Sequence, residues 1–406
     1  MTEGCEVHHD MGILYGNFDV RSQPRTTLAG HILRILRVTD AATRTELATA
    51  VGSPLATVTR DVAELVRHGL VFDRHDLLAK GVPGRQHVPV SLNTENFMTF
   101  GAHVGARVTR VVVGDLRAEA LDFDEFPTPA TPHAAVESVA STMARYREMF
   151  PFRAVLAAGL AIGAQFSQIG MIDHARLGWH AVPIQRMLAE ITSLPVTVAP
   201  TAEALAALEH EVAALERRSS SLLYFYIRET VGAAWALDGI VRPLGSVAHI
   251  STGSDVACPC GRIGCLEATV AEQTLIDRAV RDGVVTDDEA DEGIAAVYRL
   301  ASSGDSDATN LVRERAWYIG RAVGRIRDVI NPDALVMGGQ AVTGFADTMP
   351  EIARVARERS VLPDLPIRFS SLVDGGIQTT AALYTSLVPV LGDPIGLMHA
   401  GTSSQR

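Results

Sequence analysis

The sequence predicts an α/β body of two lobes behind a small basic module at the N-terminus. From about Phe97, apolar segments such as "RAVLAAGLAIGAQ" and "LPVTVAP" alternate with helical segments such as "AEALAALEHEVAALERR", a pattern typical of α/β folds. A chain of 406 residues is too long for one hydrophobic core. The segment from Arg21 to Asn93 carries ten basic and six acidic residues, a net charge of +4, which leaves −15 for the rest. A basic module on an acidic body favours nucleic-acid binding at one end only.

Residues 25–69 show the pattern of a helix-turn-helix. In "TTLAGHILRILRVTD" the apolar residues share one helical stripe. In "TRTELATAVG" a Thr43 N-cap is followed three residues later by Glu46, which makes a capping box, and Gly52 suits the end of that helix. The next helix is predicted to begin with Ser53 as its N-cap and Pro54 at its first position.

The start of this next helix carries the residues that we expect to contact DNA. Its apolar positions face a core, whereas hydroxyl groups and an arginine lie near its start on the other side, as in a helix-turn-helix. After Gly69, two short predicted strands around a loop indicate a wing whose tip would place an arginine in a minor groove. The alternative for this tip is a solvated loop with an incidental arginine. The predicted DNA-binding residues are Ser53, Thr57, Thr59, Arg60, Gly84 and Arg85.

Several function classes are excluded for the body. No G-x-G-x-x-G motif opens a helix after its first strand, and no Walker A motif is present, which excludes a Rossmann dinucleotide site and a P-loop. The apolar runs are far shorter than the ~20 residues of a membrane span. The N-terminus carries acids where a signal peptide needs a basic region. We therefore expect a cytoplasmic protein, in which clustered cysteines are more often metal ligands or redox groups than disulfides.

Three of the four cysteines lie within eight positions, in "HISTGSDVACPCGRIGCLEA". Together with the upstream His249, residues Cys258, Cys260 and Cys265 make a complete tetrahedral ligand set for Zn²⁺, with no open position for water. A closed set indicates a structural ion and not a catalytic one. Two alternatives stay open, namely a disulfide that includes Cys265 and three small buried residues.

Several segments occur in the order found in the ROK family, which the chain resembles from about residue 25 to 395. They are the helix-turn-helix, "GVPGRQHVPVSLN", "LGWHAVPI", "LPVTVAPTAEAL", "GSVAHI", "CPCGRIGCLE" and "INPDALVMGGQ". ROK proteins are sugar-responsive repressors and sugar kinases on the actin-like ATPase fold. The resemblance implies this fold for the body, and the winged helix-turn-helix resembles the repressor branch. It also implies that His249 and the three cysteines bind a zinc ion that shapes the effector pocket.

The positions that carry catalysis in ROK kinases are changed here. The E-N-D-A segment that supplies the catalytic aspartate is Ala199 to Ala202, which puts Thr201 where the general base is expected. The second phosphate loop, usually glycine-rich, begins with Arg228 and Glu229, whose side chains would block close approach of a phosphate to the backbone. His103 replaces an acidic residue of the first phosphate turn. We therefore predict no catalytic residues and no sugar-kinase activity.

The same changes weaken the expected sugar pocket. A glutamate that contacts sugar in the family has become Ser246, and only His249 and Glu267 remain of the expected shell. Each lost hydrogen bond removes roughly 1 kcal/mol of binding free energy, so we expect weak binding of an ordinary glucose-like sugar, and an effector that differs from it or no effector. The predicted effector-binding residues are Ser246, His249 and Glu267. For Glu267 the alternative is a carboxylate that supports a helix start or a neighbouring ligand.

Together these patterns predict a DNA-binding transcriptional regulator of the ROK type, with repression as the expected sign and carbohydrate metabolism as the expected context. The expected partners are a double-stranded DNA operator, a second copy of the chain in a homodimer or homotetramer, a small-molecule effector that is a sugar or a derivative, and structural Zn²⁺, with no membrane. The alternatives are a ligand-independent DNA-binding dimer and an active sugar kinase. The predicted divisions are a flexible N-terminal tail (1–24), the winged helix-turn-helix (25–95), a first lobe (96–199 plus 385–406) and a second lobe with the zinc site and dimerisation helices (200–384).

Overall fold

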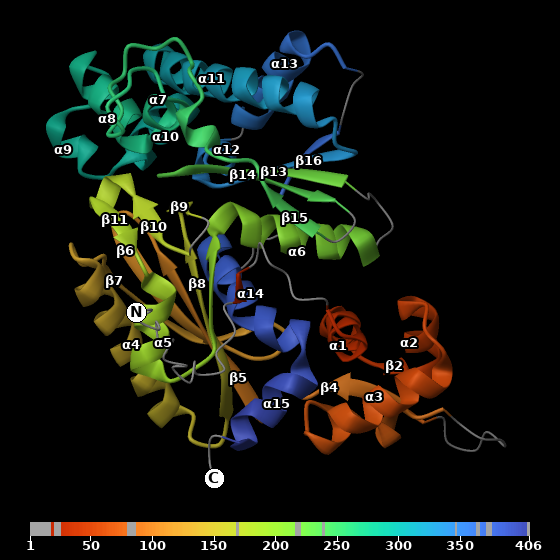
Figure 1. Ribbon diagram of the computed structural model, residues 1–406. Coiled ribbons are helices and arrows are strands. Elements are labelled where there is room, and N and C mark those ends of the chain that lie inside the picture. The colour runs from red at the N-terminus through yellow and green to blue at the C-terminus, as the bar shows by residue number, and fades with distance from the viewer. Residues whose placement is uncertain are drawn as a thin grey trace, which may run out of the picture.

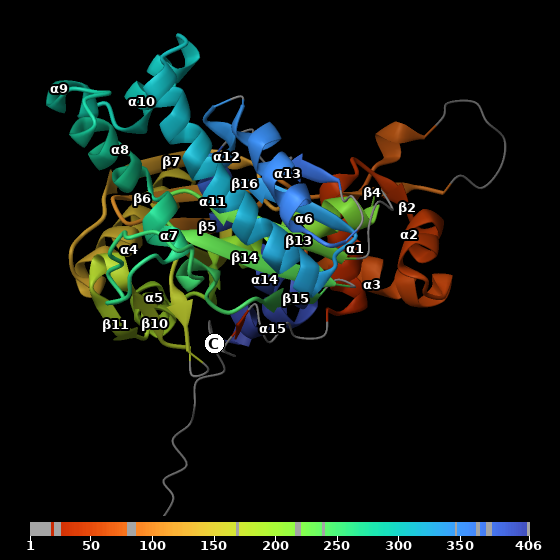
Figure 2. The same ribbon diagram turned by 90° about the horizontal axis from the view of Figure 1, so that it is seen from above.

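In this computed structural model the described residues form an N-terminal module and two α/β lobes, one above the other (Figure 1). This arrangement confirms the predicted fold class. The described residues are 18–19, 26–78, 87–167, 170–215, 221–237, 240–345, 347–362, 366–370 and 376–403. Seen from above, the module and helices α8 to α10 lie at opposite ends of the molecule (Figure 2).

The N-terminal module contains three helices and a three-stranded sheet of order β2-β4-β3. The predicted capping box is present, because the Thr43 side chain accepts from the Glu46 N–H while the Glu46 carboxylate accepts from the Thr43 N–H. Gly52 ends the same helix at φ 63°, a left-handed conformation that favours glycine. The elements are α1 (Leu28–Val38), β2 (Ala42–Thr43), α2 (Arg44–Val51), α3 (Leu55–Arg67), β3 (Val71–Asp73), η2 (His75–Leu77) and β4 (Pro89–Leu92).

Helix α3 begins one residue later than the sequence predicts. Its N-cap is Pro54 and not Ser53, and no side chain caps it. Pro54 has ψ 136°, which is extended, and its carbonyl accepts from the N–H groups of Thr57 and Val58. The proline therefore precedes the first helical turn instead of occupying it.

The first lobe is built on a six-stranded sheet of order β1-β12-β8-β5-β6-β7. Helices α4 and α5 cover one face through a shared apolar core, and α14 covers the other (Figure 1). The strands are β1 (Phe18–Asp19), β5 (Phe97–Val104), β6 (Val108–Gly114), β7 (Ala120–Pro127), β8 (Ala154–Ile162) and β12 (Val196–Pro200). The helices are α4 (Pro132–Met149), α5 (Ile184–Thr192) and α14 (Ile377–Gly392), and a small sheet joins β9 (Gln165–Phe166), β10 (Ile172–His174) and β11 (Trp179–Val182) beside η3 (Ala175–Leu177).

Two glycines let α14 lie directly on the first sheet. A Cβ atom on Gly159 would come within 2.2 Å of the Ser386 backbone nitrogen, and one on Gly101 within 2.7 Å of the Ala382 carbonyl carbon. Any larger residue would push the helix away from the sheet, because backbone atoms cannot yield as a flexible side chain can. The predicted first-lobe segment 385–406 starts inside α14, which is one continuous helix from Ile377 to Gly392. The predicted domain boundaries stay predictions.

The second lobe is built on a five-stranded sheet of order β15-β14-β13-β16-β17. Alternate residues of β13 pack on α6 on one face and on α11 on the other. The strands are β13 (Ser221–Ile227), β14 (Val231–Leu237), β15 (Ile240–Pro243), β16 (Ala334–Gly338) and β17 (Ile367–Phe369). The helices are α6 (Thr201–Leu215), η4 (Val247–His249), α7 (Leu266–Val270), α8 (Glu272–Arg281), α9 (Asp287–Ala290), α10 (Ile294–Ser302), α11 (Ser306–Ile330), α12 (Gln340–Thr343) and α13 (Thr348–Arg359).

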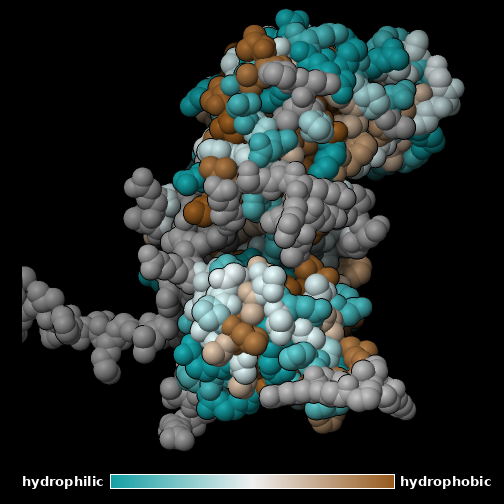
Figure 3. All heavy atoms as spheres, turned by 90° about the vertical axis from the view of Figure 1, so that its right-hand side faces the viewer, coloured by the Kyte–Doolittle hydropathy of each residue, from teal (hydrophilic) through white to brown (hydrophobic). Residues whose placement is uncertain are grey.

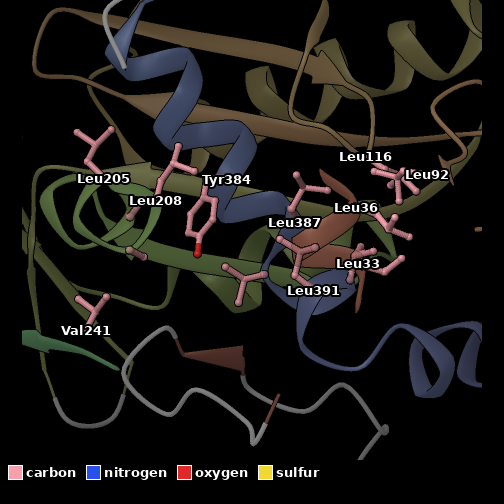
Figure 4. Close-up of a cluster of buried hydrophobic side chains, with 14 of the residues drawn as sticks. Leu33, Leu36, Leu92, Leu116, Leu205, Leu208, Val241, Tyr384, Leu387 and Leu391 are labelled. Atoms are coloured by element: carbon pink, nitrogen blue, oxygen red, sulfur yellow. The ribbon is translucent and has the colours of Figure 1, made fainter. Parts of the chain in front are cut away.

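One apolar cluster joins the N-terminal module to the body. Leu33 and Leu36 of α1 belong to the same cluster as Leu387 and Leu391 of α14 and as residues of α6 (Figure 4). A Cβ on Gly30 would lie 2.4 Å from the Leu391 carbonyl oxygen, so α1 sits close to the end of α14. The module is thus packed against the body and is not merely tethered to it.

No single helix among the described residues is long and apolar enough to cross a membrane. In the part of the chain that the structure describes, only α14 together with residues Pro394–Ala400 of α15 (Pro394–Ser403) reaches the required length and hydropathy, and that pair is bent by 86°. The side chains of α14 are largely buried within the protein.

Candidate functional site

The four predicted metal ligands come together in one place. Their ligand atoms all lie within 4.8 Å of one another. The Cys258 Sγ lies 3.8 Å from the His249 Nδ1, and the Cys260 Sγ lies 3.7 Å from the Cys265 Sγ. In a tetrahedral zinc site with bonds of about 2.3 Å, neighbouring sulfur ligands are about 3.8 Å apart. The donor set and its spacing therefore fit Zn²⁺.

The loop that carries the cysteines is shaped by two glycines and a hydroxyl network. Gly261 and Gly264 have φ values of 86° and 73°, which are left-handed. A Cβ on Gly264 would also meet the Ser254 carbonyl oxygen at 2.6 Å. The Thr252 Oγ1 donates to the Gly264 carbonyl and contacts the Thr269 Oγ1. These contacts hold the loop beside η4, which ends at His249, and α7, whose N-cap is Cys265.

The surroundings shift the pKa values of the three thiols in different directions. Burial, followed by contact with the other two thiols, raises the pKa of the Cys265 thiol to about 12. Burial also raises the pKa of Cys258, whereas the backbone N–H of Arg262 lowers the pKa of Cys260. Three thiolates so close together repel one another, and a divalent cation would offset that repulsion.

The predicted DNA-contacting groups on α3 lie largely on its exposed side. Thr59 and Arg60 are exposed, and Thr57 is half-buried. The Thr59 hydroxyl donates to the Leu55 carbonyl at 2.8 Å, and the Arg60 side chain, 72% exposed, lies 3.3 Å from the Asp61 Oδ1. Gly84 and Arg85 at the predicted wing tip lie outside the described residues, although β3 and β4 pair antiparallel on either side of that loop. Figure 3 shows the side that carries this module, where hydrophilic residues mix with small hydrophobic patches.

The positions compared with ROK kinase motifs lie where the two lobes meet. Thr201 begins α6, is buried, and its hydroxyl has no hydrogen-bond partner among the described residues. Burial, followed by the charges of Arg228 and Arg110, lowers the pKa of His103 on β5 to about 3. Arg228 and Glu229 form a tight hairpin turn between β13 and β14, in which the Arg228 N–H donates to the Thr230 carbonyl at 3.1 Å.

The predicted effector residues are engaged with protein groups. The Ser246 hydroxyl accepts from the Gln165 side-chain amide at 2.6 Å. Glu267 accepts from the Val231 N–H at 2.9 Å and lies 3.6 Å from the Arg176 Nε. Burial raises the pKa of Glu267, and the Val231 N–H and Arg176 oppose that rise. His249 belongs to the metal cluster described above.

Sequence reasoning missed two clusters in which one glutamate lies between two arginines. The inter-lobe cluster contains Arg107, which follows β5, Arg176 in η3 and Glu229. The module cluster joins α1 to α6 through Arg34, Arg37 and Glu211. In both clusters the glutamate lies 53 or more residues from each of its arginine partners in the chain, so no local motif reveals either cluster.

Comparison with known proteins agrees with this architecture. Transcriptional regulator Rv0485 of Mycobacterium tuberculosis is 34% identical over 386 residues, which cover 91% of this chain and 87% of that protein. A crystal structure of a ROK family transcriptional regulator, a homologue of the E. coli MLC protein, superposes with a TM-score of 0.74 at 20% identity and covers 92% of this chain and 98% of its own. The ROK hexokinase of Thermus thermophilus gives a TM-score of 0.57 at 26% identity, covering 72% of this chain and 99% of its own.

The sequence model of the ROK family matches residues 99–371, which is more than half of the chain. The match covers parts of both lobes and the whole cysteine cluster. The chain belongs to the ROK family.

Proposed function

We propose that this protein is a DNA-binding transcriptional regulator of the ROK type, with repression as its mode. The observation that carries the proposal is the exposed start of α3, where Thr59 and Arg60 face solvent in a helix-turn-helix packed on a ROK body. The relationship to Rv0485, which is named a transcriptional regulator, supports the same role. A homodimer or homotetramer of the body would hold two such modules at a fixed separation and read a two-fold related operator.

We propose further that the body has no kinase activity, although sugar kinases belong to the same family. A buried threonine stands where the catalytic aspartate is expected, and Thr201 cannot act as a general base near neutral pH. The turn that would approach the nucleotide phosphates carries Arg228 and Glu229, and Glu229 forms ion pairs across the lobes. An assay of ATP turnover with a panel of hexoses should give no rate above background. A rate that Thr201→Ala or Arg228→Gly alters would contradict this.

In this proposal His249, Cys258, Cys260 and Cys265 hold a structural Zn²⁺. Bound zinc would brace the loop between η4 and α7 and leave no open position for chemistry. Cys260→Ser should release the metal and lower both the thermal midpoint and DNA binding, as measured by elemental analysis, a melting curve and a gel shift. Cys5→Ser is the matched control and should keep the metal. Unchanged metal content in Cys260→Ser would refute the assignment.

The decisive experiment for the proposed regulator is a gel-shift titration at several salt concentrations. The DNA is the region upstream of the gene that encodes this protein. Binding should weaken steeply with salt, because phosphate contacts release counterions. Arg60→Ala should lower the affinity about 10-fold or more, the loss expected for one base-edge contact. Arg67→Ala is the matched control, because Arg67 is 61% exposed at the opposite end of α3. Equal losses in the two variants, or binding insensitive to salt, would contradict the proposal.

A further inference from the structure

The hairpin turn between β13 and β14, residues 228–230, belongs to the second lobe and packs against the first lobe. A Cβ on Gly163, just after β8, would lie 2.4 Å from the Thr230 Oγ1. Glycine at this position therefore makes room for the turn. Nearby, the Gln165 amide donates to Ser246 across the same junction. The turn is a point of direct contact between the lobes.

The Glu229 carboxylate at this turn is held between two guanidinium groups of the first lobe. One oxygen, Oε1, pairs with the Arg107 Nη2, and the other, Oε2, lies 3.5 Å from the Arg176 Nη1. Guanidinium groups are common partners of carboxylate and phosphate groups, because their N–H groups donate charge-assisted hydrogen bonds to both. The first lobe thus presents an oxyanion site, and a side chain of the second lobe occupies it.

Two further carboxylates of the second lobe lie close to the same two arginines. The Arg107 Nη2 also lies 3.8 Å from the Glu272 Oε2, and the Arg176 Nε lies 3.6 Å from the Glu267 Oε1. Three carboxylates of the second lobe therefore share two guanidinium groups of the first. The Arg107 side chain is 54% exposed, whereas those of Glu229 and Arg176 are 18% and 20% exposed, so solvent and solutes reach the cluster from the side of Arg107. Partly exposed ion pairs are weak and exchange readily with ions from solution.

We propose that Arg107 and Arg176 form a binding site for a small oxyanion, that Glu229 occupies it as an internal ligand, and that a bound oxyanion frees the hairpin turn from the first lobe. The ligand class is a molecule with a carboxylate or phosphate group. The inference rests on the proposed function, since it names a ligand class for the regulator body. It differs from a neutral sugar site formed by Ser246, His249 and Glu267.

The turn is joined to the DNA-binding module by continuous packing. Gly232, just beyond the turn, faces Ala202 in the first turn of α6, because a Cβ at Gly232 would lie 2.9 Å from the Ala202 Cβ. Near the other end of α6, Glu211 binds Arg34 and Arg37 of α1. Release of the turn would therefore act on a helix that contacts both the lobe junction and the module.

The test compares anion binding by the full-length wild-type protein and by Glu229→Gln. The probes are inorganic phosphate and malonate, followed by calorimetry and thermal shift against sodium chloride of equal ionic strength. Loss of the internal carboxylate should raise the affinity for one or both probes about 10-fold, because an internal ligand reduces the fraction of open sites. A gain with phosphate alone identifies a phosphate site, and a gain with malonate alone identifies a carboxylate site. No gain with either probe would overturn the proposal.

Two further variants show where the anion binds. The double variant Glu229→Gln, Arg176→Gln should lose the gain, and equal binding by the double and single variants would overturn the assignment. Glu358→Gln removes the same charge from an exposed ion pair with Arg354 on α13 and should bind the probes like the wild type. A gel shift in parallel separates the two proposals. If Glu229→Gln gains anion binding but the wild type does not bind DNA, only the regulator proposal fails.

Discussion

The protein contains two clusters of the same composition, one glutamate between two arginines, in different surroundings. In the module cluster, Glu211 receives Arg37 at 2.7 Å on one oxygen and Arg34 at 3.3 Å on the other. In the inter-lobe cluster, Glu229 lies between Arg107 and Arg176. The Arg37 side chain is 6% exposed, whereas that of Arg107 is 54% exposed. The chemistry is shared, and the access of solvent differs.

This difference decides what each cluster can do. The module cluster contacts the apolar core through Tyr384, which is labelled in Figure 4, because the Arg34 guanidinium also donates to the Tyr384 hydroxyl at 3.2 Å. Burial by itself lowers the pKa of Arg34, but Tyr384 and Glu211 raise it well above its usual value. A charge buried this way is costly without its partner. The module cluster therefore fixes α1 on the body, whereas the inter-lobe cluster can exchange its carboxylate.

The largest expected effect comes from breaking the module cluster. Glu211→Gln removes the negative charge and leaves two arginines facing a neutral amide in a nearly dry environment. We expect the free energy of unfolding to fall by about 3 kcal/mol, the cost of an uncompensated buried charge. Urea denaturation measures this loss. Hydrogen exchange should show that the variant opens faster than the wild type at α1, with a smaller difference at α11.

The variant Glu229→Gln serves as the control, since it makes the same chemical change in the cluster whose Arg107 is exposed. If both variants lost equal stability, burial would not be what separates the two clusters. If Glu211→Gln were as stable as the wild type, the module would be held by its apolar contacts alone.

A smaller effect is expected in the inter-lobe cluster. Glu229→Gln should change the free energy of unfolding by less than about 1 kcal/mol, as for other partly exposed ion pairs. The change should shrink further in 1 M salt, because screening already weakens the pairs in the wild type. Chemical denaturation at low and high salt measures both values. A loss that salt does not alter would show that Glu229 is shielded from solvent.

What the sequence predicted correctly depends mostly on residues close together in the chain. The capping box requires Thr43 and Glu46, three positions apart, and the cluster of one histidine and three cysteines, whose metal stays a prediction, runs over only 17 residues from His249 to Cys265. Such patterns can be recognised without knowledge of the fold, because residues that are close in the chain also lie close together in space. The ROK resemblance then supplied the architecture of the lobes.

The clusters of arginine and glutamate could not be predicted in this way. Glu211 lies 174 residues from Arg37, inside an alanine-rich helix that gives no sign of an ion pair. Glu229 was interpreted only as an obstacle to phosphate binding, because its partner Arg107 is 122 residues away. For Glu267, the sequence left a sugar contact and a supporting carboxylate open, and the structure has it bound to Val231 and Arg176.

The smallest expected effect is a change in the pH dependence of stability. It depends on the repulsion between the carboxylates of Glu229 and Glu272. Burial, followed by the charge of Glu229, raises the pKa of Glu272 above its ordinary value of 4.5. The folded protein thus binds this proton more tightly than the unfolded chain does. The contribution of Glu272 to stability must therefore increase as the pH falls from neutral through its raised pKa.

Glu272→Gln, which is uncharged at every pH, should flatten the slope of unfolding free energy in the pH range above 4.5, the ordinary pKa of the group. Glu229→Gln should flatten it in part, because the neighbouring charge that raises the pKa of Glu272 is gone. Glu358→Gln, on the distant face of α13, should keep the wild-type slope. Denaturation midpoints at several pH values compare the four proteins. If the slope of Glu229→Gln were identical to that of the wild type, the carboxylates of Glu229 and Glu272 would not interact. Arg107 would then form an independent ion pair with each of them.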